Sequence, residues 1–379
     1  MNDMNEATTT GILTIDLQAL QQNYQNIRDY CLNFDSNIAV SAVVKANGYG
    51  LGMAEVSTAL YKAGCRLFYV ATPDEGMALR KTLADIDIFI LDGLFIDAEK
   101  IYQTHNLIPC LSSQAQISNW YSYGQSIGTQ LPCVLHLNTG INRLGLNLAG
   151  FKAMPTTITQ SLNIHHVMSH FASADVPDDA QNLTQIAEIK QIVDFSPQLD
   201  YSFGNSPGIA YEPLQNMDFL NTHIMRPGVA LCGVKTTDNY PIELKPVVSL
   251  FVRVLQTSSL EVGDMVGYGH QFTATKPMRT AIVAAGYADG MFRSLATSTE
   301  NSGYFEFKGH KLPILGRVSM DMMVLDISQV PDGALNEGDF VEIFGQNISL
   351  AQVANWAGTI EYEILTSLGP RFLRNYING

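Results

Sequence analysis

The feature that most constrains the fold of this chain is a series of eight short apolar runs in its first two thirds. They are rich in Val, Ile, Leu and Phe and do not alternate with polar residues, as is typical of strands buried on both faces. Amphipathic segments such as 53–63 and 182–193 lie between several runs and indicate helices. The runs are Ile38–Val44, Leu67–Ala71, Ile86–Leu91, Ile108–Leu111, Cys133–Leu137, Ile164–Ser169, Tyr201–Phe203 and Thr222–Met225. This α/β pattern predicts a (β/α)8 barrel of the TIM type, with a doubly wound sheet as the alternative.

The pattern changes after residue 243, which predicts a second domain. Short strands separated by Gly and Pro follow one another there, with one helix at Leu350–Ala357 near the end. The predicted strands are Val247–Leu255, Met265–Tyr268, Thr280–Ala284, Tyr304–Phe307, Met322–Ile327 and Phe340–Phe344. We therefore expect a barrel over 12–243 and a mostly-β domain over 244–379. A spare strand at Ile12–Leu17 can pair with either domain.

Composition limits the class of protein and its partners. The 379 residues carry a net charge of −14 with no basic tract, which argues against a nucleic-acid partner. The longest apolar runs, such as Ile86–Ile96, contain Asp and are too short to span a bilayer. The five cysteines are scattered without a CxxC pair, so we expect buried thiols, no disulfide framework and no metal site. The polar stretch 1–11 lacks the pattern of a secretory signal, and a cytoplasmic protein is expected.

Chemically active side chains follow the ends of several predicted strands. Each has an ordinary interpretation when it is taken alone, such as a surface charge or a satisfied core histidine. In a barrel, however, the carboxyl ends of the strands converge on one rim, where active sites of this fold lie. The side chains are Lys45 after the first strand, Arg143 after the fifth, His170 after the sixth, Asn205 and Ser206 after the seventh, and Arg226 after the eighth.

This set suggests a phosphorylated aldehyde as cofactor. A desolvated lysine such as Lys45 can form a Schiff base with a carbonyl group. The loops after strands seven and eight commonly bind phosphate in such barrels, and here they supply Ser206 and the backbone N–H groups near Gly228 and Val229. Pyridoxal phosphate fits both features. A Schiff-base aldolase acting on a sugar phosphate fits the spacing equally well.

The segment 43–50, Val-Val-Lys-Ala-Asn-Gly-Tyr-Gly, resembles the cofactor-lysine signature of the alanine racemases, which are fold-type III pyridoxal-phosphate enzymes. An ordered series of further matches extends the resemblance over nearly the whole chain from Ile12. These matches are Thr139–Gly145, His170–Asp175, Asn205-Ser206, Arg226-Pro227-Gly228, Gly267-Tyr268-Gly269, Gly286–Gly290 and Gly316–Asp321.

The resemblance implies a head-to-tail homodimer in which each active site takes a second base from the partner's β domain. Lys45 would hold the cofactor covalently, and Lys45 and Tyr268 would be the two bases that interconvert L- and D-alanine. The cofactor-binding set that it implies is Lys45, Tyr49, His170, Asn205, Ser206, Arg226, Gly228 and Val229. Within it Tyr49, Ser206 and the Gly228–Val229 backbone would contact the phosphate, and Arg226 would face the pyridine nitrogen. His170 would link Arg226 toward Tyr268.

The same resemblance implies the substrate contacts and the entrance of the site. Arg143 and Met320, with Asp321 beside them, would bind the substrate carboxylate or the cofactor hydroxyl. Asp175, Tyr287, Arg293 and Arg317 match entrance positions. The implied role is an isomerase that supplies D-alanine for peptidoglycan.

Several positions depart from the family pattern. His136 stands where many members carry a carbamylated lysine, so Arg143 would be positioned by Asn138 and the backbone or by an anion. Gly48 replaces the usual Ala, Leu51 the usual His, and Pro370 a Tyr that contacts the phosphate in some relatives.

Three alternatives stay open on the sequence. A racemase of broad specificity or one acting on serine would have the same motifs. A fold-type III decarboxylase would carry Glu at the pyridine nitrogen and a catalytic Cys in the second domain, but this chain has Arg226 and no Cys after Cys232. A non-catalytic pyridoxal-phosphate-binding protein would lack the second domain.

Overall fold

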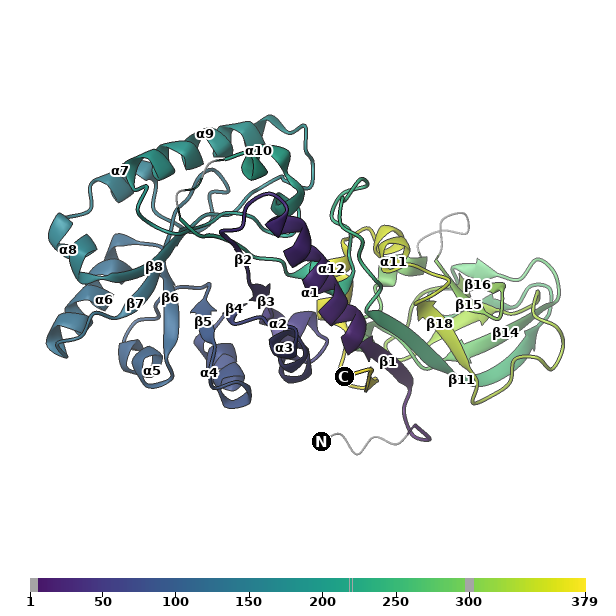
Figure 1. Ribbon diagram of the computed structural model, residues 1–379. Coiled ribbons are helices and arrows are strands. Elements are labelled where there is room, and N and C mark those ends of the chain that lie inside the picture. The colour runs from purple at the N-terminus through teal and green to yellow at the C-terminus, as the bar shows by residue number, and fades with distance from the viewer. Residues whose placement is uncertain (1–5, 218, 220, 297–302) are drawn as a thin grey trace. The chain divides into compact units, whose positions relative to one another are not determined.

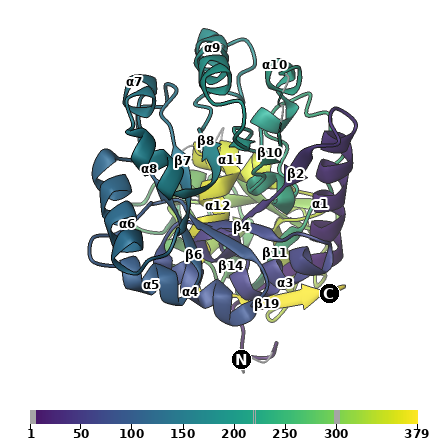
Figure 2. The ribbon, with the colours of Figure 1, turned by 60° about the vertical axis from the view of Figure 1, so that its left-hand side comes forward.

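The computed structural model describes residues 6–217, 219, 221–296 and 303–379. The chain divides into two compact units, which Figures 1 and 2 show as ribbons. One unit is Ala19–Lys245, and the other combines Met1–Gln18 with Pro246–Gly379. The N-terminal segment therefore belongs to the same unit as the C-terminal third of the chain.

The unit Ala19–Lys245 is built on a parallel sheet with the order β2-β10-β9-β8-β7-β6-β5-β4-β3. The strands at its two ends, β2 (Ile38–Val40) and β3 (Ala42–Val43), are consecutive pieces of one run, so the sheet closes. This confirms the predicted barrel and excludes the doubly wound sheet. The remaining strands are β4 (Leu67–Val70), β5 (Asp87–Ile90), β6 (Leu107–Leu111), β7 (Pro132–His136), β8 (Asn163–Met168), β9 (Tyr201–Ser202) and β10 (His223–Met225).

Helices form the outer layer of this barrel (Figure 2). Their starts follow from local sequence: the Thr72 hydroxyl accepts from Glu75 N, and the Glu75 carboxylate accepts from Thr72 N, which together cap α4. Pro73 occupies the first turn of the same helix, where its missing N–H costs nothing. The helices are α1 (Leu17–Leu32), α3 (Met53–Lys62), α4 (Pro73–Thr82), α5 (Glu99–Thr104), α6 (Gln114–Ser126), α7 (Leu148–Lys152), α8 (Thr156–Ser161), α9 (Ala180–Phe195) and α10 (Glu212–Gln215).

The second unit is mostly antiparallel sheet with the order β14-β17-β16-β15-β18-β11-β1-β19. β14 also pairs with β11, so that part of the sheet turns back on itself. β1 (Gly11–Asp16) pairs with β11 and β19, so the strand predicted at Ile12–Leu17 belongs to the sheet of the second unit. The other elements are β11 (Val248–Leu260), β12 (Met265–Val266), β13 (Phe272–Thr273), β14 (Met278–Val283), β15 (Tyr304–Phe307), β16 (His310–Leu315), β17 (Met323–Asp326), β18 (Phe340–Phe344), α11 (Leu350–Ala357), α12 (Glu361–Ser367) and β19 (Leu373–Ile377).

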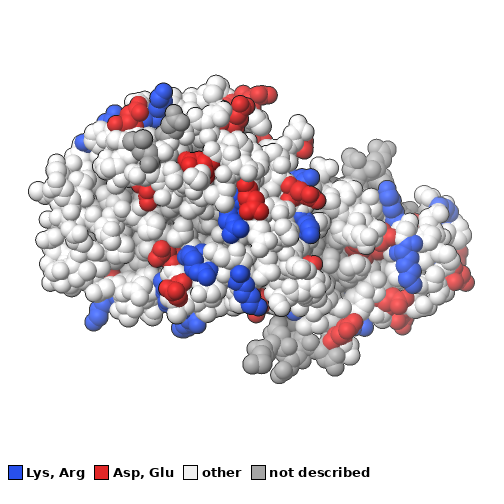
Figure 3. Space-filling view, in the orientation of Figure 1, with Lys and Arg blue, Asp and Glu red and all other residues white. Residues whose placement is uncertain are grey.

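The surface and the interior carry further information about class. Figure 3 shows Lys and Arg side chains intermixed with Asp and Glu on the face that it presents. All five cysteines lie in the described part of the chain, where they are buried free thiols as expected. None of the helices in the described ranges is long and apolar enough to cross a bilayer.

Candidate active site

Lys45 follows β3 after a single residue, Val44, and begins a short left-handed turn, α2 (Lys45–Tyr49). Ala46, Asn47 and Tyr49 have φ values of 52°, 55° and 56°, and the turn is closed by a bond from Gly48 N to Val44 O of 2.9 Å. A left-handed helical conformation costs roughly 1–2 kcal/mol for each non-glycine residue. Strain of this kind persists only where surrounding structure enforces it, and it concentrates at functional sites.

The surroundings of Lys45 favour its neutral form. Burial lowers the pKa of its amine, and the positive charge of Arg143 lowers it further. The carboxylates of Asp92 and Glu75 act in the opposite direction. The net lowering makes this amine more available as a nucleophile or base than an exposed lysine would be.

A cradle of backbone N–H groups lies at the ends of β9 and β10. The Ser206 hydroxyl accepts from Gly228 N at 3.0 Å and from Ala230 N at 3.4 Å. Tyr49 is buried against Gly228 so closely that a Cβ at position 228 would overlap its hydroxyl. Asn205 orders the adjoining loop, because its Oδ1 accepts from Gly208 N at 2.9 Å. The sequence therefore folds Tyr49, Ser206 and the Gly228 backbone into one group of neighbouring polar atoms.

Arg226 is buried at the centre of the barrel rim, with 3% of its surface exposed. One terminal nitrogen donates to the backbone oxygen and the hydroxyl of Ser202, both at 2.5 Å. The other donates to Ser169 O at 2.6 Å. A planar guanidinium can reach acceptors on two neighbouring strands in this way, whereas the single ammonium of lysine cannot.

Polar side chains lie beneath Arg226 inside the barrel. Its guanidinium carbon is 5.9 Å from the centre of the Tyr69 ring. The Tyr69 hydroxyl contacts His166 Nε2 at 2.8 Å, and His166 Nδ1 is 2.9 Å from His165 Nδ1. His165 Nε2 lies 3.8 Å from the carboxylate of Asp87 at the opposite end of the barrel. A polar chain thus runs through a core that is otherwise aromatic and aliphatic.

His170 lies beside Arg226 on the same rim. Its Nε2 is 3.4 Å from the Asn205 side-chain nitrogen, which is able to donate to it. Burial holds the pKa of His170 well below its usual range, and the charge of Arg226 adds to this effect. Gln185 fixes the backbone here by donating to His170 O at 2.9 Å. His170 is therefore a neutral neighbour of the cationic Arg226.

His136 and Arg143 occupy the rim after β7. His136 is buried, burial lowers its pKa to about 4, and neither ring nitrogen has a partner within the described residues. Arg143 is exposed, and no hydrogen bond or ion pair joins it to any residue that the structure describes. Asn138 orders the backbone of this loop instead, because its Oδ1 accepts from Gly140 N and Asn142 N.

The remaining candidates belong to the second unit. Tyr268 is 75% exposed in the β12–β13 hairpin, and both flanking glycines have positive φ. Tyr287 N donates to Ser319 O at 3.0 Å and Ala288 N to Met320 O at 2.9 Å, so the Tyr287 and Met320 segments are neighbours.

The entrance candidates Arg293 and Arg317 and the substrate candidate Asp321 also lie in the second unit. Arg293 is exposed at the start of a 3-10 turn, and the Arg317 guanidinium lies against Gly269. Asp321 forms an ion pair of 2.8 Å with Arg371, which also contacts Asp289 at 2.9 Å.

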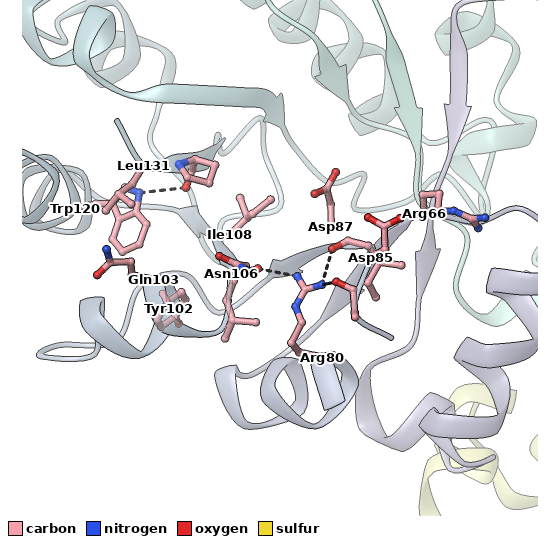
Figure 4. Close-up of a pocket in the computed structure, with 14 residues that line it drawn as sticks. Arg66, Arg80, Asp85, Asp87, Tyr102, Gln103, Asn106, Ile108, Trp120 and Leu131 are labelled. Atoms are coloured by element: carbon pink, nitrogen blue, oxygen red, sulfur yellow. Dashed lines mark hydrogen bonds between the residues drawn. The ribbon is translucent and has the colours of Figure 1, made fainter. Parts of the chain in front are cut away.

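Two cavities in the barrel unit are lined by none of the rim residues Lys45, Tyr49, Ser206 and Arg226. One, of about 770 Å³, is lined by Asp175 together with other acidic and proline residues. The other, of about 590 Å³, lies near the amino ends of β4 to β7 (Figure 4). The guanidinium of Arg80, which lines this cavity, donates hydrogen bonds to four backbone carbonyl groups, those of residues 84, 86, 105 and 106. The structure thus brings Lys45, Tyr49, His170, Asn205, Ser206, Arg226 and Gly228 together at one rim, and Asp175 lies outside that set.

Comparison with known proteins identifies the family of this chain. The model for the alanine racemase N-terminal domain matches residues 15–236, and the model for the C-terminal domain matches 247–376. The chain belongs to the alanine racemase family. A catabolic alanine racemase of Agrobacterium fabrum is 41% identical, over 97% of this chain and 92% of the relative. Another catabolic alanine racemase, from Mesorhizobium japonicum, is 39% identical over 99% and 96% of the two chains.

A solved structure agrees with this assignment. The crystal structure of alanine racemase from Bartonella henselae, which contains covalently bound pyridoxal phosphate, matches with a TM-score of 0.89. It is 36% identical, and the match covers 97% of this chain and 99% of that one. The motif-based family resemblance is therefore confirmed.

Sequence reasoning missed the contact between Glu75 and the turn that carries Lys45. Glu75 receives the Ala46 N–H at 2.7 Å and thereby contacts the turn that carries Lys45. Thr72 and Glu75 have the spacing of a capping box, so its helix-capping role could have been predicted. The contact with the lysine turn could not, because it joins residues 29 positions apart.

Proposed function

We propose that the chain is a pyridoxal-phosphate-dependent alanine racemase that interconverts L- and D-alanine by two-base proton transfer. The observation that carries this proposal is Lys45, partly desolvated, in a strained turn beside the Tyr49–Ser206–Gly228 cradle. Family membership and the covalently bound cofactor of the Bartonella relative support it.

The rim residues fit the cofactor. The Gly228 and Ala230 N–H groups directed at Ser206, the hydroxyls of Ser206 and Tyr49, and a glycine with no room for a Cβ suit a phosphate group. When bound, pyridoxal phosphate would supply an electron sink that acidifies the α-C–H bond of the amino acid. Lys45 would hold it covalently, with His170, Asn205 and Val229 completing the surroundings. Arg226 has only donors and stays charged, so it would keep a ring nitrogen facing it unprotonated. An unprotonated ring nitrogen would weaken the electron sink of the cofactor, which would favour return of the proton to the α-carbon over other reactions.

Inversion of a centre requires a base on each face of it. Lys45 Nζ would take or give the proton on one face, and the lowered pKa of its amine suits it for that role near neutral pH. Tyr268 Oη of the partner subunit would serve the opposite face. Arg143, Met320 and Asp321 would hold the substrate carboxylate and its surroundings.

We further propose a head-to-tail homodimer with shared sites. Met265 and Tyr268 of the β12–β13 hairpin are 56% and 75% exposed, Val262 in the turn before it is 65% exposed, and Met320 is 52% exposed. Large apolar groups exposed around a candidate catalytic tyrosine favour burial against a second copy. Tyr287, Arg293, Arg317 and Asp175 would then border the entrance.

Subunit mixing tests the shared site. Lys45→Ala and Tyr268→Phe are each expected to give inactive homodimers. After dissociation and reassociation of an equal mixture, half of the dimers are mixed, and each carries one intact site. About a quarter of wild-type racemisation should return, measured by chiral chromatography. Lack of recovery, in variants shown to exchange subunits, would refute the shared arrangement.

The proposal extends to the substrate range and to the physiological direction of the reaction. A narrow entrance between Tyr268 and Tyr287 would favour alanine, but a methylene-sized change discriminates by only about 1–3 kcal/mol, so serine is the second candidate substrate. D-alanine supply for peptidoglycan in the cytoplasm is the proposed role. The names of the Agrobacterium and Mesorhizobium relatives favour catabolism as the second candidate. Deletion in the source cell would produce D-alanine dependence only in the first case.

A further inference from the structure

We propose that Glu75 is a positioning residue that holds the left-handed turn of Lys45 in place. This rests on the proposed function of Lys45 and adds to it. The Glu75 carboxylate bridges two neighbouring strand ends. One oxygen accepts from Ala46 N at 2.7 Å, next to Lys45, and the other accepts from Ala71 N at 2.8 Å, directly after β4.

The first strained amide of the turn, that of Ala46, has its acceptor outside the turn. The internal hydrogen bonds of the turn run from Gly48 N to Val44 O and from Gly50 N to Ala46 O. The Ala46 N–H precedes them, and Ala46 is exposed. Its acceptor is the Glu75 carboxylate. Because Ala46 also adopts the strained left-handed conformation, the bond to Glu75 holds the turn at its first strained residue.

The position of Glu75 makes it a rigid support. It lies in the first turn of α4, where the helix dipole favours a carboxylate. Its own backbone N–H donates to the Thr72 hydroxyl at 3.3 Å, a bond that caps the helix and does not involve the carboxylate. The same carboxylate is one of the charges that act on the Lys45 amine, together with Asp92 and Arg143. Neutral His170 is the other titratable neighbour.

Three variants separate the charge of the Glu75 carboxylate from its hydrogen bonds and from the capping of α4. Glu75→Gln keeps the shape, but its single oxygen cannot accept from both amides and its charge is lost. Glu75→Asp keeps the charge, but the shorter side chain cannot span from α4 to Ala46. Thr72→Ala removes the cap of α4 and leaves the Ala46 contact. Asp74→Asn, an exposed charge in the same helical turn, is the matched charge control.

The first measurement is hydrogen exchange of the Ala46 amide in the full-length protein, with thermal unfolding as a check of folding. We expect exchange in Glu75→Gln and Glu75→Asp to be at least about tenfold faster than in wild type. Thr72→Ala and Asp74→Asn should change it little. Unchanged exchange in the Glu75 variants, or equal acceleration in Thr72→Ala, would overturn the proposal.

The second measurement separates charge from geometry. The pH dependence of Lys45 acylation by acetic anhydride, read by mass spectrometry on full-length protein freed of cofactor, reports the titration of the amine. Its midpoint should move to lower pH in Glu75→Gln, because a nearby negative charge is lost, and stay nearly unchanged in Glu75→Asp and Asp74→Asn. An unshifted midpoint in Glu75→Gln would contradict the role at Lys45. Neither measurement requires racemase activity, so failure of the proposed function would be recognised separately.

Discussion

The phosphate cradle makes a sharp prediction at Gly228. A Cβ built there would overlap the Tyr49 hydroxyl and lie 2.9 Å from ring carbon Cζ and 3.2 Å from Cε2. Carbon atoms in favourable contact are about 3.5–4.0 Å apart, so in Gly228→Ala the ring must retreat by roughly 1 Å. The ring cannot move freely, because Tyr49 ends the strained turn that begins at Lys45.

Overpacking of this kind costs about 1–3 kcal/mol. Because the strain falls on groups proposed to hold the phosphate, the affinity for pyridoxal phosphate should fall by about 10–100-fold. Fluorescence titration of the cofactor-free protein measures it. Gly309→Ala is the control for a strained glycine substitution away from the rim, since its φ is 89° and no atom lies within 4 Å of a Cβ there. Cofactor affinity in Gly228→Ala equal to that of the control would refute the cradle.

Three further predictions concern the barrel rim and the polar side chains beneath it. Arg226→Lys should lose about 1.5–3 kcal/mol in the free energy of unfolding, because one ammonium cannot serve acceptors on both Ser169 and Ser202; a change below about 0.5 kcal/mol in urea unfolding would contradict this. The folded-state pKa of His136, about 4, lies below its unfolded value of about 6.5, so its neutral form is favoured by folding and stability falls as pH drops from about 6.5 toward 4. His136→Leu should therefore lose about 2 kcal/mol less than wild type between pH 7 and pH 5 in urea unfolding, and an equal loss would contradict the assignment. Tyr69→Phe should cost about 1–3 kcal/mol by leaving His166 Nε2 unpaired, and unchanged stability would show that the contact contributes nothing.

The apolar runs sufficed to predict the barrel because strands buried on both faces leave a continuous hydrophobic signal. Two of the second-unit strands, β15 and β18, and helix α11 match their predicted bounds. β16 was missed because Pro313 and two basic residues interrupt it, yet Pro313 pairs opposite Tyr304. β19 and α12 were missed because their short amphipathic patterns resemble those of a surface tail.

The candidate site, like the fold, could be predicted from the sequence only in part. The order of strands and motifs predicted which residues meet at the barrel rim, because the carboxyl ends of parallel strands must converge. The left-handed turn at Ala46 to Tyr49 has only a partial local signal, since Asn47 and Gly48 tolerate positive φ whereas Ala46 and Tyr49 do not. The bond from Ala46 to Glu75 that accompanies it arises from packing between two strand–helix units.

The most direct test of the central claim is racemisation of L-alanine in deuterium oxide by the cofactor-loaded enzyme. The two-base account predicts D-alanine with deuterium at the α-carbon, because the proton taken on one face differs from the one delivered on the other. Both Lys45→Ala and Tyr268→Phe should lose this product by at least about a thousandfold. D-alanine that retains its original α-hydrogen, or Tyr268→Phe with wild-type turnover, would contradict the account.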